Sequence, residues 1–427
     1  MSDSPRRLES AAAFVGFPAF RQALTISILI ATLIPDALRV AWGRPGEWAV
    51  LATLVVLAAL SLAATRRDVE WRGILPFSLL ALVGWVALSV FWSDYPLTSL
   101  PAAVVFSATA FLGVYIALAR DLIQLVRALG DALRAILVTS LVLEVLSGIV
   151  LDTALPFLHI QGNLAEGGPI QGLAGSRSHL GFLAGLGLVT FLIEWRTLSV
   201  TRTTAIISIS TAVLLVFFSG SPVTALVLTG VGIALLILWG VRRMPEGPRR
   251  RVQPAILGAA LVAAGIGWAA RSQIVATLGA GSDLTARLDL WHEIIELVRV
   301  RPVEGWGWIG NWSRNVFPYS TVTGAGDRLP TSAHNAYIDA LIQIGVVGSA
   351  IFVIALGLGI ARAWLVASEA RSTVAVWPAL VLLLLAATGL AESYPLVDGG
   401  LVLLVAACIA AARRRSWRRL LRDVDAT

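Results

Sequence analysis

The sequence predicts an all-α protein that crosses a membrane many times, and three observations lead to this prediction. Hydrophobic residues make up 57% of the 427-residue chain, and the mean hydropathy is +0.81. Only 14% of the residues are charged, whereas an ordinary soluble domain carries about 25%. Apolar runs of about 20 residues, enough to cross a bilayer as a helix, recur along the whole chain. They leave no room for a separate soluble domain of ordinary size.

The spacing of the apolar runs predicts about twelve transmembrane helices. Only Gly220 and Ser221 separate the seventh run from the eighth, which predicts a tight hairpin. The tenth run is the longest, and we expect its first part to lie in the rim of the membrane. The expected helices cover approximately 21–41, 47–65, 73–92, 100–119, 130–151, 179–195, 203–219, 222–241, 253–270, 334–361, 374–391 and 397–412.

The arginines predict the orientation. The net charge is +7, and all basic residues are arginine. With an even number of spans, most of them fall in alternate connections and in both tails, so the positive-inside rule places both termini in the cytoplasm. We therefore expect a cytoplasmic tail over 1–20, a membrane domain over 21–412 and a basic cytoplasmic tail over 413–427. Arginines in short loops between spans do not indicate nucleic-acid binding, and no cleavable signal peptide is expected at the N-terminus.

Two connections on the predicted outer face are long, which in compact proteins usually means function or disorder. The first covers 152–178. The second, 271–333, is the largest polar segment of the chain. An amphipathic pattern over 284–300 predicts a helix there that lies against the membrane surface.

Arginines occur in these outer connections, where the positive-inside rule does not require them. A guanidinium group presents a planar fork of donors that suits phosphate oxygens. The alternative is that each arginine pairs with an acidic residue of the loop, such as Glu293, Glu296, Glu304 or Asp327. The arginines concerned are Arg177, Arg287, Arg299, Arg301, Arg314 and Arg328.

His334 and Asn335 stand where the second outer loop turns into the tenth span. The chain has four histidines, and an imidazole can accept a proton from a hydroxyl group near neutral pH. The alternative for His334 is a structural hydrogen bond at the helix start, and Asn335 can orient a substrate or cap the helix. Asp339 and Gln343 continue a polar stripe at spacings of four, and polar groups within a membrane helix tend to be functional.

The sequence predicts neither a metal site nor a cofactor site. The outer segments contain no His-x-x-x-His or Asp-x-Asp pattern, and the chain has no glycine-rich loop of the nucleotide-binding type. A nucleotide-sugar donor is therefore not supported. Phosphate chemistry on the outer face requires a donor carried on a lipid.

Three stretches resemble the O-antigen ligase and Wzy-type polymerase superfamily, whose members are polytopic glycosyltransferases. The first contains Arg287-x-x-x-Trp291 and then Pro302-x-x-Gly305-x-Gly307. The second is His334-Asn335-Ala-Tyr337, followed by Gly345-x-x-Gly348, and the third, weaker stretch runs from Gly175 to Gly181 with Arg177 and His179. Many relatives carry an arginine soon after a Ser-Gly-Ser run, whereas Ser219-Gly-Ser221 is followed here by Pro222, Val223 and Thr224.

The resemblance implies a glycosyltransferase C-like membrane fold and a metal-independent, inverting glycosyltransferase that transfers sugars or oligosaccharides. The donor would be an oligosaccharide on undecaprenyl diphosphate, and the acceptor a glycan or glycolipid at the outer face of the cytoplasmic membrane. It assigns His334 as general base or acceptor-orienting group and Arg177 and Arg287 as diphosphate clamps, with Arg314 and Arg328 as further candidates. Asn335 would contact substrate. Trp291, with Trp306, Trp308 and Trp312, would stack on sugars, the alternative being anchorage in the membrane interface.

Several alternatives stay open at this point. Within the family, a ligase passes the glycan to a different acceptor molecule, whereas a polymerase extends the glycan itself, and nothing in the sequence separates the two. A transporter or flippase for a polysaccharide lipid is the main rival, although it would need polar residues spread through the middle of the membrane. A scaffolding protein would leave the outer arginines without a purpose.

Overall fold

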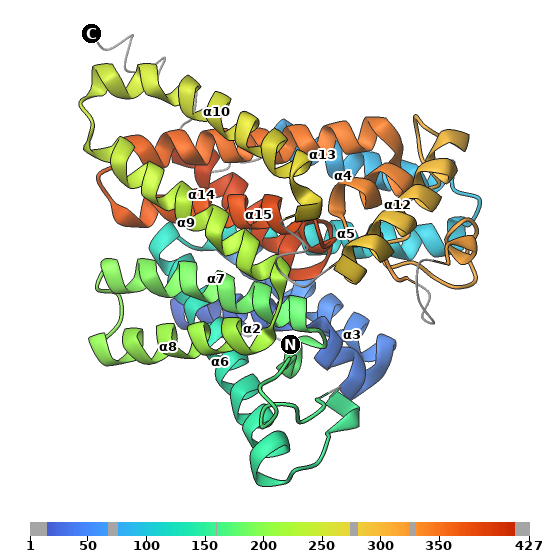
Figure 1. Cartoon of the computed structure of the whole chain (residues 1–427), viewed down its shortest axis with the longest axis horizontal. Coiled ribbons are helices and arrows are strands. Elements are labelled where there is room, and N and C mark those ends of the chain that lie inside the picture. Colours follow the sequence, from blue (N-terminus) through green and yellow to red (C-terminus); the bar gives the residue numbers. More distant parts are fainter. Residues whose placement is uncertain (1–14, 67–75, 159, 274–280, 324–329, 415–427) are drawn as a thin grey trace, which may run out of the picture.

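The computed structural model describes residues 15–66, 76–158, 160–273, 281–323 and 330–414. In this part of the chain the protein is a bundle of α-helices without a β-sheet; the extended backbone forms one isolated bridge, between Leu155 and Ile160. The helices are α2 (Pro18–Leu33), α3 (Pro35–Ala64), α4 (Phe77–Leu88), α5 (Pro96–Ala119), α6 (Leu122–Val145), α7 (Arg177–Arg196), α8 (Arg202–Ser219), α9 (Pro222–Arg243), α10 (Glu246–Ala269), α12 (Gly281–Val300), α13 (Ala336–Glu369), α14 (Trp377–Thr388) and α15 (Asp398–Arg414) (Figure 1).

Seven of the described helices are long and apolar enough to cross a membrane, and α2, α4 and α14 are shorter apolar helices. Every predicted span overlaps a helix, which confirms an all-α membrane protein, while the count of twelve spans stays a prediction. The expected first span is divided between two helices, because Pro35 occupies the first turn of α3. Within α3 the chain kinks at Gly43, which has φ +69°.

Short polar residues determine where many of the helices begin. The side chains of Asp121, Ser176, Thr201 and Ser221 each accept a hydrogen bond from the backbone N–H three residues later, which satisfies a donor that the first helical turn leaves unpaired. Gly220 ends α8 in the left-handed conformation. The predicted tight hairpin between α8 and α9 is thereby confirmed.

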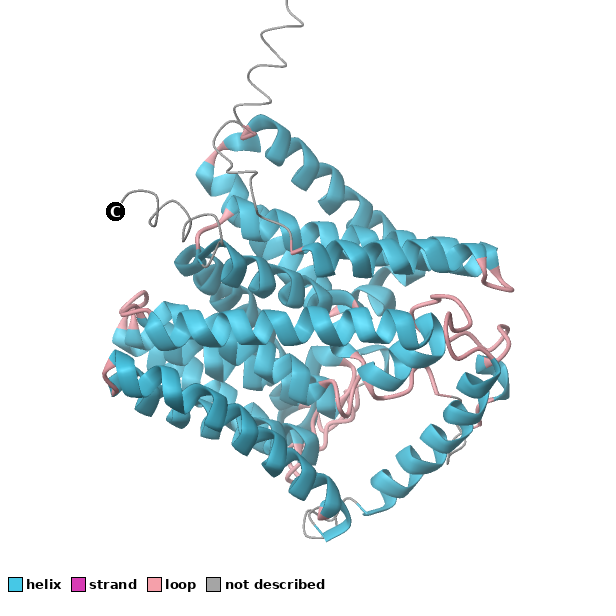
Figure 2. Ribbon diagram, turned by 90° about the horizontal axis from the view of Figure 1, so that it is seen from above, coloured by secondary structure: helices cyan, strands magenta, loops and turns pink. Residues whose placement is uncertain are grey.

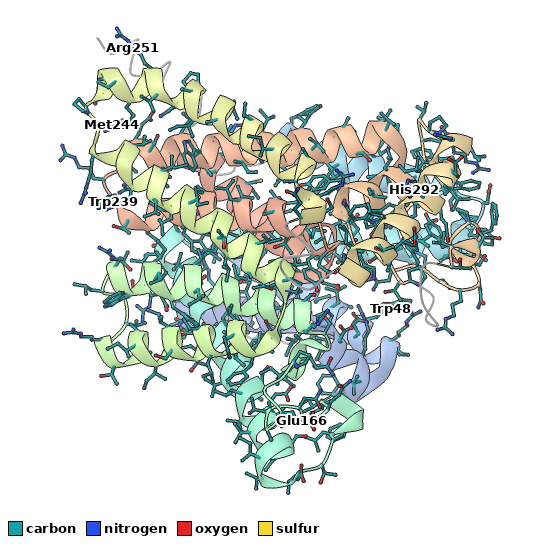
Figure 3. All side chains as sticks on the ribbon, viewed as in Figure 1. Trp48, Glu166, Trp239, Met244, Arg251 and His292 are labelled. Atoms are coloured by element: carbon teal, nitrogen blue, oxygen red, sulfur yellow. The ribbon has the colours of Figure 1, made fainter. Side chains whose placement is uncertain are left out.

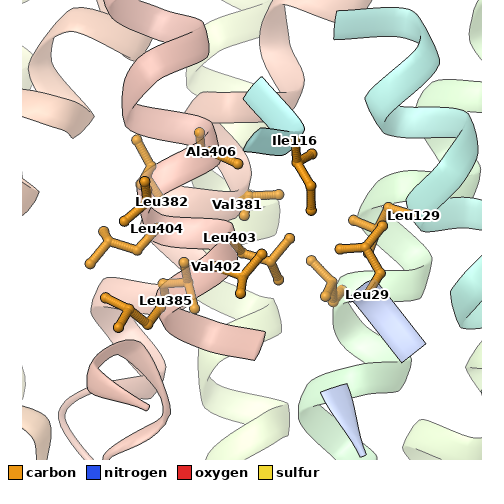
Figure 4. Close-up of a cluster of buried hydrophobic side chains, with 14 of the residues drawn as sticks. Leu29, Ile116, Leu129, Val381, Leu382, Leu385, Val402, Leu403, Leu404 and Ala406 are labelled. Carbon is orange, nitrogen blue, oxygen red and sulfur yellow. The ribbon is translucent and has the colours of Figure 1, made fainter. Parts of the chain in front are cut away.

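The core surrounds α15, whose residues from Leu401 to Ala412 are almost all buried. Leucine and valine side chains of α14 and α15 meet those of α2, α5 and α6 there (Figure 4). Lipid tails are as apolar as these side chains, so close packing rather than escape from water holds such helices together. Small residues permit it: Gly113 of α5 lies against Val405, and Gly359 of α13 lies against Cys408.

The bundle has two distinct ends. Its helices run side by side, and much of the irregular chain gathers towards one end (Figure 2). Figure 3 shows Trp239 and Met244 at one end of the bundle, and His292 and Trp48 at the other. The end with His292 also carries α12, which confirms the helix predicted over 284–300 in the second outer loop.

Helix α13 is broken near its start, and a loop fills the break. Gly345 has non-helical backbone angles, and the loop over 302–307 pairs with the broken turn. Backbone groups inside a membrane protein must find internal partners, and here the loop and one indole supply them. The bonds run from Trp306 N to Ile342 O, from Gly307 N to Gln343 O, from Val346 N to Pro302 O, from Val347 N to Val303 O and from Trp85 Nε1 to Ile344 O.

We expect Gly345→Ala to unfold the end of the bundle that carries α12. A methyl group at Gly345 would overlap the backbone of Val303 and Glu304, and φ is +67° there. A loss of about 3 kcal/mol or more in the free energy of unfolding follows from such a clash. Gly357→Ala in the same helix is the control, because no atom lies near its side-chain position. Thermal unfolding in detergent compares the two, and equal stability would contradict this account of the break.

Candidate functional site

Asn335 fixes the start of α13 and ties it to the turn after α14. Its side-chain oxygen accepts hydrogen bonds from the backbone N–H groups of Tyr337 (3.0 Å) and Ile338 (3.2 Å). Its amide nitrogen donates to the carbonyl oxygen of Leu390 at 3.0 Å. Asn335 is buried, so its own contacts favour the capping role, and a substrate contact stays a prediction.

The turn after α14 brings Glu392 next to His334. The Nδ1 atom of His334 lies 3.4 Å from the Oε2 atom of Glu392. The Glu392 side chain is only 9% exposed, whereas that of His334 is 41% exposed. A buried carboxylate thus holds one ring nitrogen of a histidine whose side chain is open to a substrate.

Helix α12 places Arg287 and Trp291 over the same site. Arg287 Nη2 lies 3.3 Å from Glu392 Oε1, and Nη1 donates to the carbonyl oxygens of His334 (3.1 Å) and Ala391. The indole nitrogen of Trp291 donates to the carbonyl oxygen of Ala333 at 2.9 Å. Residues four apart lie on one face of a helix, so one face of α12 holds the backbone at Ala333 and His334. The predicted role of Trp291 in sugar stacking is untested.

The ion pairs give Glu392 a defined charge. Burial alone would raise the pKa of Glu392, but the hydrogen bond with His334 and the charges of His334 and Arg287 outweigh it and lower the pKa. Its contribution to stability is therefore present above the ordinary glutamate pKa of about 4.3 and is lost as the pH falls through the lowered value. At neutral pH Glu392 is an anion, and it can accept a hydrogen bond from Nδ1 when the His334 ring is neutral. In that tautomer Nε2 is the ring nitrogen that can accept a proton.

We expect Glu392→Gln to lower the rate of the predicted glycan transfer roughly 10- to 100-fold. Loss of a carboxylate that orients a metal-bound histidine has an effect of this size in other proteins. The amide nitrogen of glutamine can donate to Nδ1 and so favour the opposite tautomer of His334. Glu392→Asp keeps the carboxylate and should restore part of the rate.

Glu296→Gln is the matched control, because Glu296 pairs with Arg299 on the exposed face of α12. The rate is measured against pH. A purely structural role for Glu392 would lower the amount of active protein without moving the pH profile, and that result would contradict the positioning role.

The polar stripe of α13 holds the preceding loop. The Asp339 carboxylate accepts hydrogen bonds from the indole of Trp312 (2.9 Å) and the side chain of Gln343 (3.0 Å). The Gln343 oxygen accepts the backbone N–H groups of Ile309 and Gly310. Both side chains are buried. The stripe therefore positions the loop, and Trp312 is part of that packing.

Arg177 lies at the first turn of α7, which approaches the same turn from another side. The imidazole ring of His179 lies 4.8 Å from the ring of Tyr394, and Ser178 lines a small cavity together with Glu392. Arg177 is exposed at this helix start. The structure thus brings the segment that carries Arg177 to the turn that carries Glu392.

The remaining outer arginines are not part of this cluster. Arg299 pairs with Glu296 at 2.8 Å, and Arg301 pairs with Asp94 at 3.0 Å and lies over the ring of Trp306. For Arg299 the predicted ion pair within the loop is confirmed, whereas Arg301 pairs with an acidic residue outside the loop, between α4 and α5. Arg314 is exposed on the loop after α12, and no hydrogen bond or ion pair within the described residues connects it to His334. The predicted contact of Arg328 falls outside the described residues.

A cavity of about 420 Å³ lies next to the loop 308–313, and His334, Glu392 and Arg287 are not among the residues that line it. Its walls come from α3, α5, the start of α15 and the loop 308–313, the loop that Asp339 and Gln343 hold. Apolar side chains such as Leu51 and Phe106 line most of it, and Arg39 lines its polar part with Glu47 and Asp398. Nothing among the described residues groups three His, Cys, Asp or Glu side chains as a metal site would require.

An all-α membrane bundle with a His, Glu and Arg cluster at one end defines the class of protein as a polytopic membrane protein with a polar site at one end of its helices. Residues 207–353 match the family model described as O-antigen ligase, and this match supports the resemblance of that part of the chain to the O-antigen ligase and Wzy-type superfamily. The match covers the first two stretches on which the resemblance rests. Among curated proteins, none matches this sequence.

The sequence reasoning missed Glu392, which stands in an isolated position in the last outer connection. Its partner Arg287 is 105 residues away, so no local pattern joins them. The only sequence signal was a lone acidic residue at the end of an apolar run.

The family match supports a membrane enzyme that transfers glycans, of the ligase or polymerase type, whose substrates include glycans linked to lipids.

Proposed function

We propose that this protein transfers a glycan from undecaprenyl diphosphate to an acceptor hydroxyl group at the outer face of the cytoplasmic membrane. The observation that carries the proposal is the cluster of His334, Glu392 and Arg287 at one end of the bundle. An exposed imidazole held by a buried carboxylate suits a base, and a neighbouring guanidinium suits a phosphate-bearing leaving group. The transfer of a glycan from a lipid diphosphate needs a base and a guanidinium group at the same place.

In the proposed reaction, Nε2 of His334 accepts the proton of the acceptor hydroxyl group. The acceptor oxygen forms a bond to the anomeric carbon from the face opposite the leaving group, so the configuration inverts. The bond between the anomeric carbon and the phosphate oxygen breaks, and its electron pair leaves with the lipid diphosphate. Arginine side chains stabilise the charge that develops on this diphosphate, so the chemistry needs no metal.

Arg287 and Arg177 are the proposed diphosphate ligands, and Arg314 and Arg328 are secondary candidates. Arg287 already contacts Glu392 and two backbone carbonyl oxygens, so it also holds the loop that carries His334. A diphosphate bound by Arg287 would share this guanidinium with Glu392. The cavity of about 420 Å³ offers room for part of a sugar substrate next to the loop 308–313.

The test is to incubate purified protein with a polyprenyl-diphosphate oligosaccharide, alone and with candidate glycolipid acceptors. Transfer of the glycan with release of polyprenyl diphosphate supports the proposal. Growth of the glycan without an added acceptor indicates a polymerase, and transfer only to an added acceptor indicates a ligase. Parallel reactions contain a chelator, and activity that stops and returns with a divalent ion would overturn the metal-independent mechanism.

A transfer assay in sealed vesicles separates the enzyme from the transporter or flippase alternative. In sealed vesicles that carry the donor on one leaflet, a flippase moves the lipid without breaking its glycan bond. Movement of intact donor without transfer to any acceptor would contradict the proposed function.

A further inference from the structure

Three arginines converge at the opposite end of the bundle. Arg21 of α2, Arg120 at the end of α5 and Arg413 of α15 line one cavity of about 410 Å³. Helix α5 has 24 residues, which at about 1.5 Å per residue separates its two ends by about 36 Å. Leu97, near the other end of α5, lines the cavity next to the loop 308–313, and that loop is held by Asp339 and Gln343 in the first turns of α13, close in sequence to His334. The arginine cavity is therefore remote from His334 and belongs to the end predicted to face the cytoplasm.

Each guanidinium group makes backbone contacts but retains donor capacity. Arg21 donates to the carbonyl oxygen of Ala119, and Arg413 donates to that of Ala117 at 2.8 Å. Arg120 donates to the carbonyl oxygen of Pro18 at 3.4 Å and to Gln124 at 3.5 Å. The Nε–H groups of Arg21 and Arg120 are buried and have no hydrogen-bond partner among the described residues.

The positive charge exceeds what this helix end can neutralise. The carbonyl end of a helix carries about half a negative charge, against three guanidinium groups. Asp121 is the single carboxylate among the described residues that line the cavity, and its oxygen already accepts the backbone N–H of Gln124 at the start of α6. That helix start adds further positive potential. Arg120 is only 9% exposed, and burial together with the charge of Arg21 lowers its pKa.

Buried charges in proteins are paired, because desolvation without a counter-charge is costly. Capping of α5 explains the Nη contacts of Arg21 and Arg413, but within the described residues the buried Nε–H groups of Arg21 and Arg120 and the surplus charge have no partner. The volume lies within the range of small-ligand sites, about 300–1,000 Å³. Basic pockets between transmembrane helices on the cytoplasmic side bind phosphate-bearing head groups.

We propose that Arg21, Arg120 and Arg413 form a phosphate-binding site, separate from the candidate active site, that takes the phosphate group of an anionic phospholipid or of a soluble phosphate. The fork of each guanidinium binds phosphate oxygens, and bound phosphate ties together α2, α5 and α15. Occupancy of the site therefore stabilises the bundle at this end.

The experiment compares phosphate sources on the full-length protein purified in detergent. Native mass spectrometry measures the lipid retained after addition of phosphatidylglycerol or of zwitterionic phosphatidylcholine, and thermal unfolding is followed during titration with inorganic phosphate. The variants are Arg21→Gln, Arg120→Gln and Arg413→Gln, singly and together. Arg202→Gln is the control, because Arg202 is exposed at the same end of the bundle, at the start of α8.

We expect wild type to retain phosphatidylglycerol in preference to phosphatidylcholine, with roughly fivefold weaker binding for each arginine removed and no change for the control. Stabilisation by inorganic phosphate that disappears in the variants, without a lipid preference, supports the site and assigns it a soluble ligand. If the triple variant does not fold, the binding of phosphatidylglycerol, phosphatidylcholine and inorganic phosphate to the wild-type protein tests the proposal. Wild-type protein that neither prefers phosphatidylglycerol nor responds to phosphate overturns the proposal, as does equal binding by folded variants.

Discussion

Replacement of His334 by alanine is expected to lower the rate of glycan transfer about 10²- to 10⁴-fold, the usual contribution of a positioned general base. The side chain of His334 is 41% exposed and contacts Glu392 through Nδ1. Its loss removes the proton acceptor but not the helix cap, because Asn335 supplies the capping bonds at the start of α13. We therefore expect the variant to be inserted into the membrane in wild-type amounts and to have a thermal stability close to that of the wild type.

His292→Ala is the matched control for this experiment. His292 lies on α12 at the same end of the bundle and is exposed (Figure 3), so it reports what the loss of an outer histidine does without touching the cluster. The rate is measured as the release of polyprenyl diphosphate. Transfer at the wild-type rate by His334→Ala would remove the general-base role, whatever the family of the protein.

Substitution of Arg287 by lysine is expected to lower the rate by about 10²- to 10³-fold, although the charge is kept. One guanidinium reaches Glu392 and the carbonyl oxygens of His334 and Ala391, and the ammonium group of lysine lacks the planar fork that spans such acceptors. Loss of a preorganised donor to a developing charge has an effect of this size. The substitution would impair both proposed roles of Arg287, which are to hold His334 and to bind the diphosphate.

Arg299→Lys on the same helix is the control, because Arg299 pairs with Glu296 on the exposed face. Kinetics separate the two roles of Arg287. A raised KM for the lipid donor at an unchanged kcat would indicate donor binding, and a lowered kcat would indicate support of the reacting groups. Full activity of Arg287→Lys would argue against both.

Much of the membrane architecture was predictable from the sequence, because a bilayer imposes length and hydropathy on each helix locally. The hairpin at Gly220 and the amphipathic helix over 284–300 followed from short-range patterns, and α8, α9 and α12 confirm them. The division between α2 and α3 was missed, since apolar composition continues across Pro35 while the helix does not.

For the site, the family-like motifs predicted His334 and Arg287, and the structure places both residues next to Glu392. It did not show why these motifs contain glycine. Gly305 and Gly345 approach each other so closely that a side chain on either would meet the backbone of the other segment. This contact exists only when the loop enters the break in α13, so it has no local signature.

By itself the sequence predicted a polytopic membrane protein, the resemblance to the O-antigen ligase superfamily and the polar segment in which His334 lies, because hydropathy and short motifs are properties of neighbouring residues. Only the tertiary structure joined Glu392 to His334 and Arg287, separated Arg287 from the arginines that serve surface ion pairs, and gathered Arg21, Arg120 and Arg413. The physical reason is that an ion pair depends on distance in space. Residues far apart in the chain meet only where helix packing places their side chains.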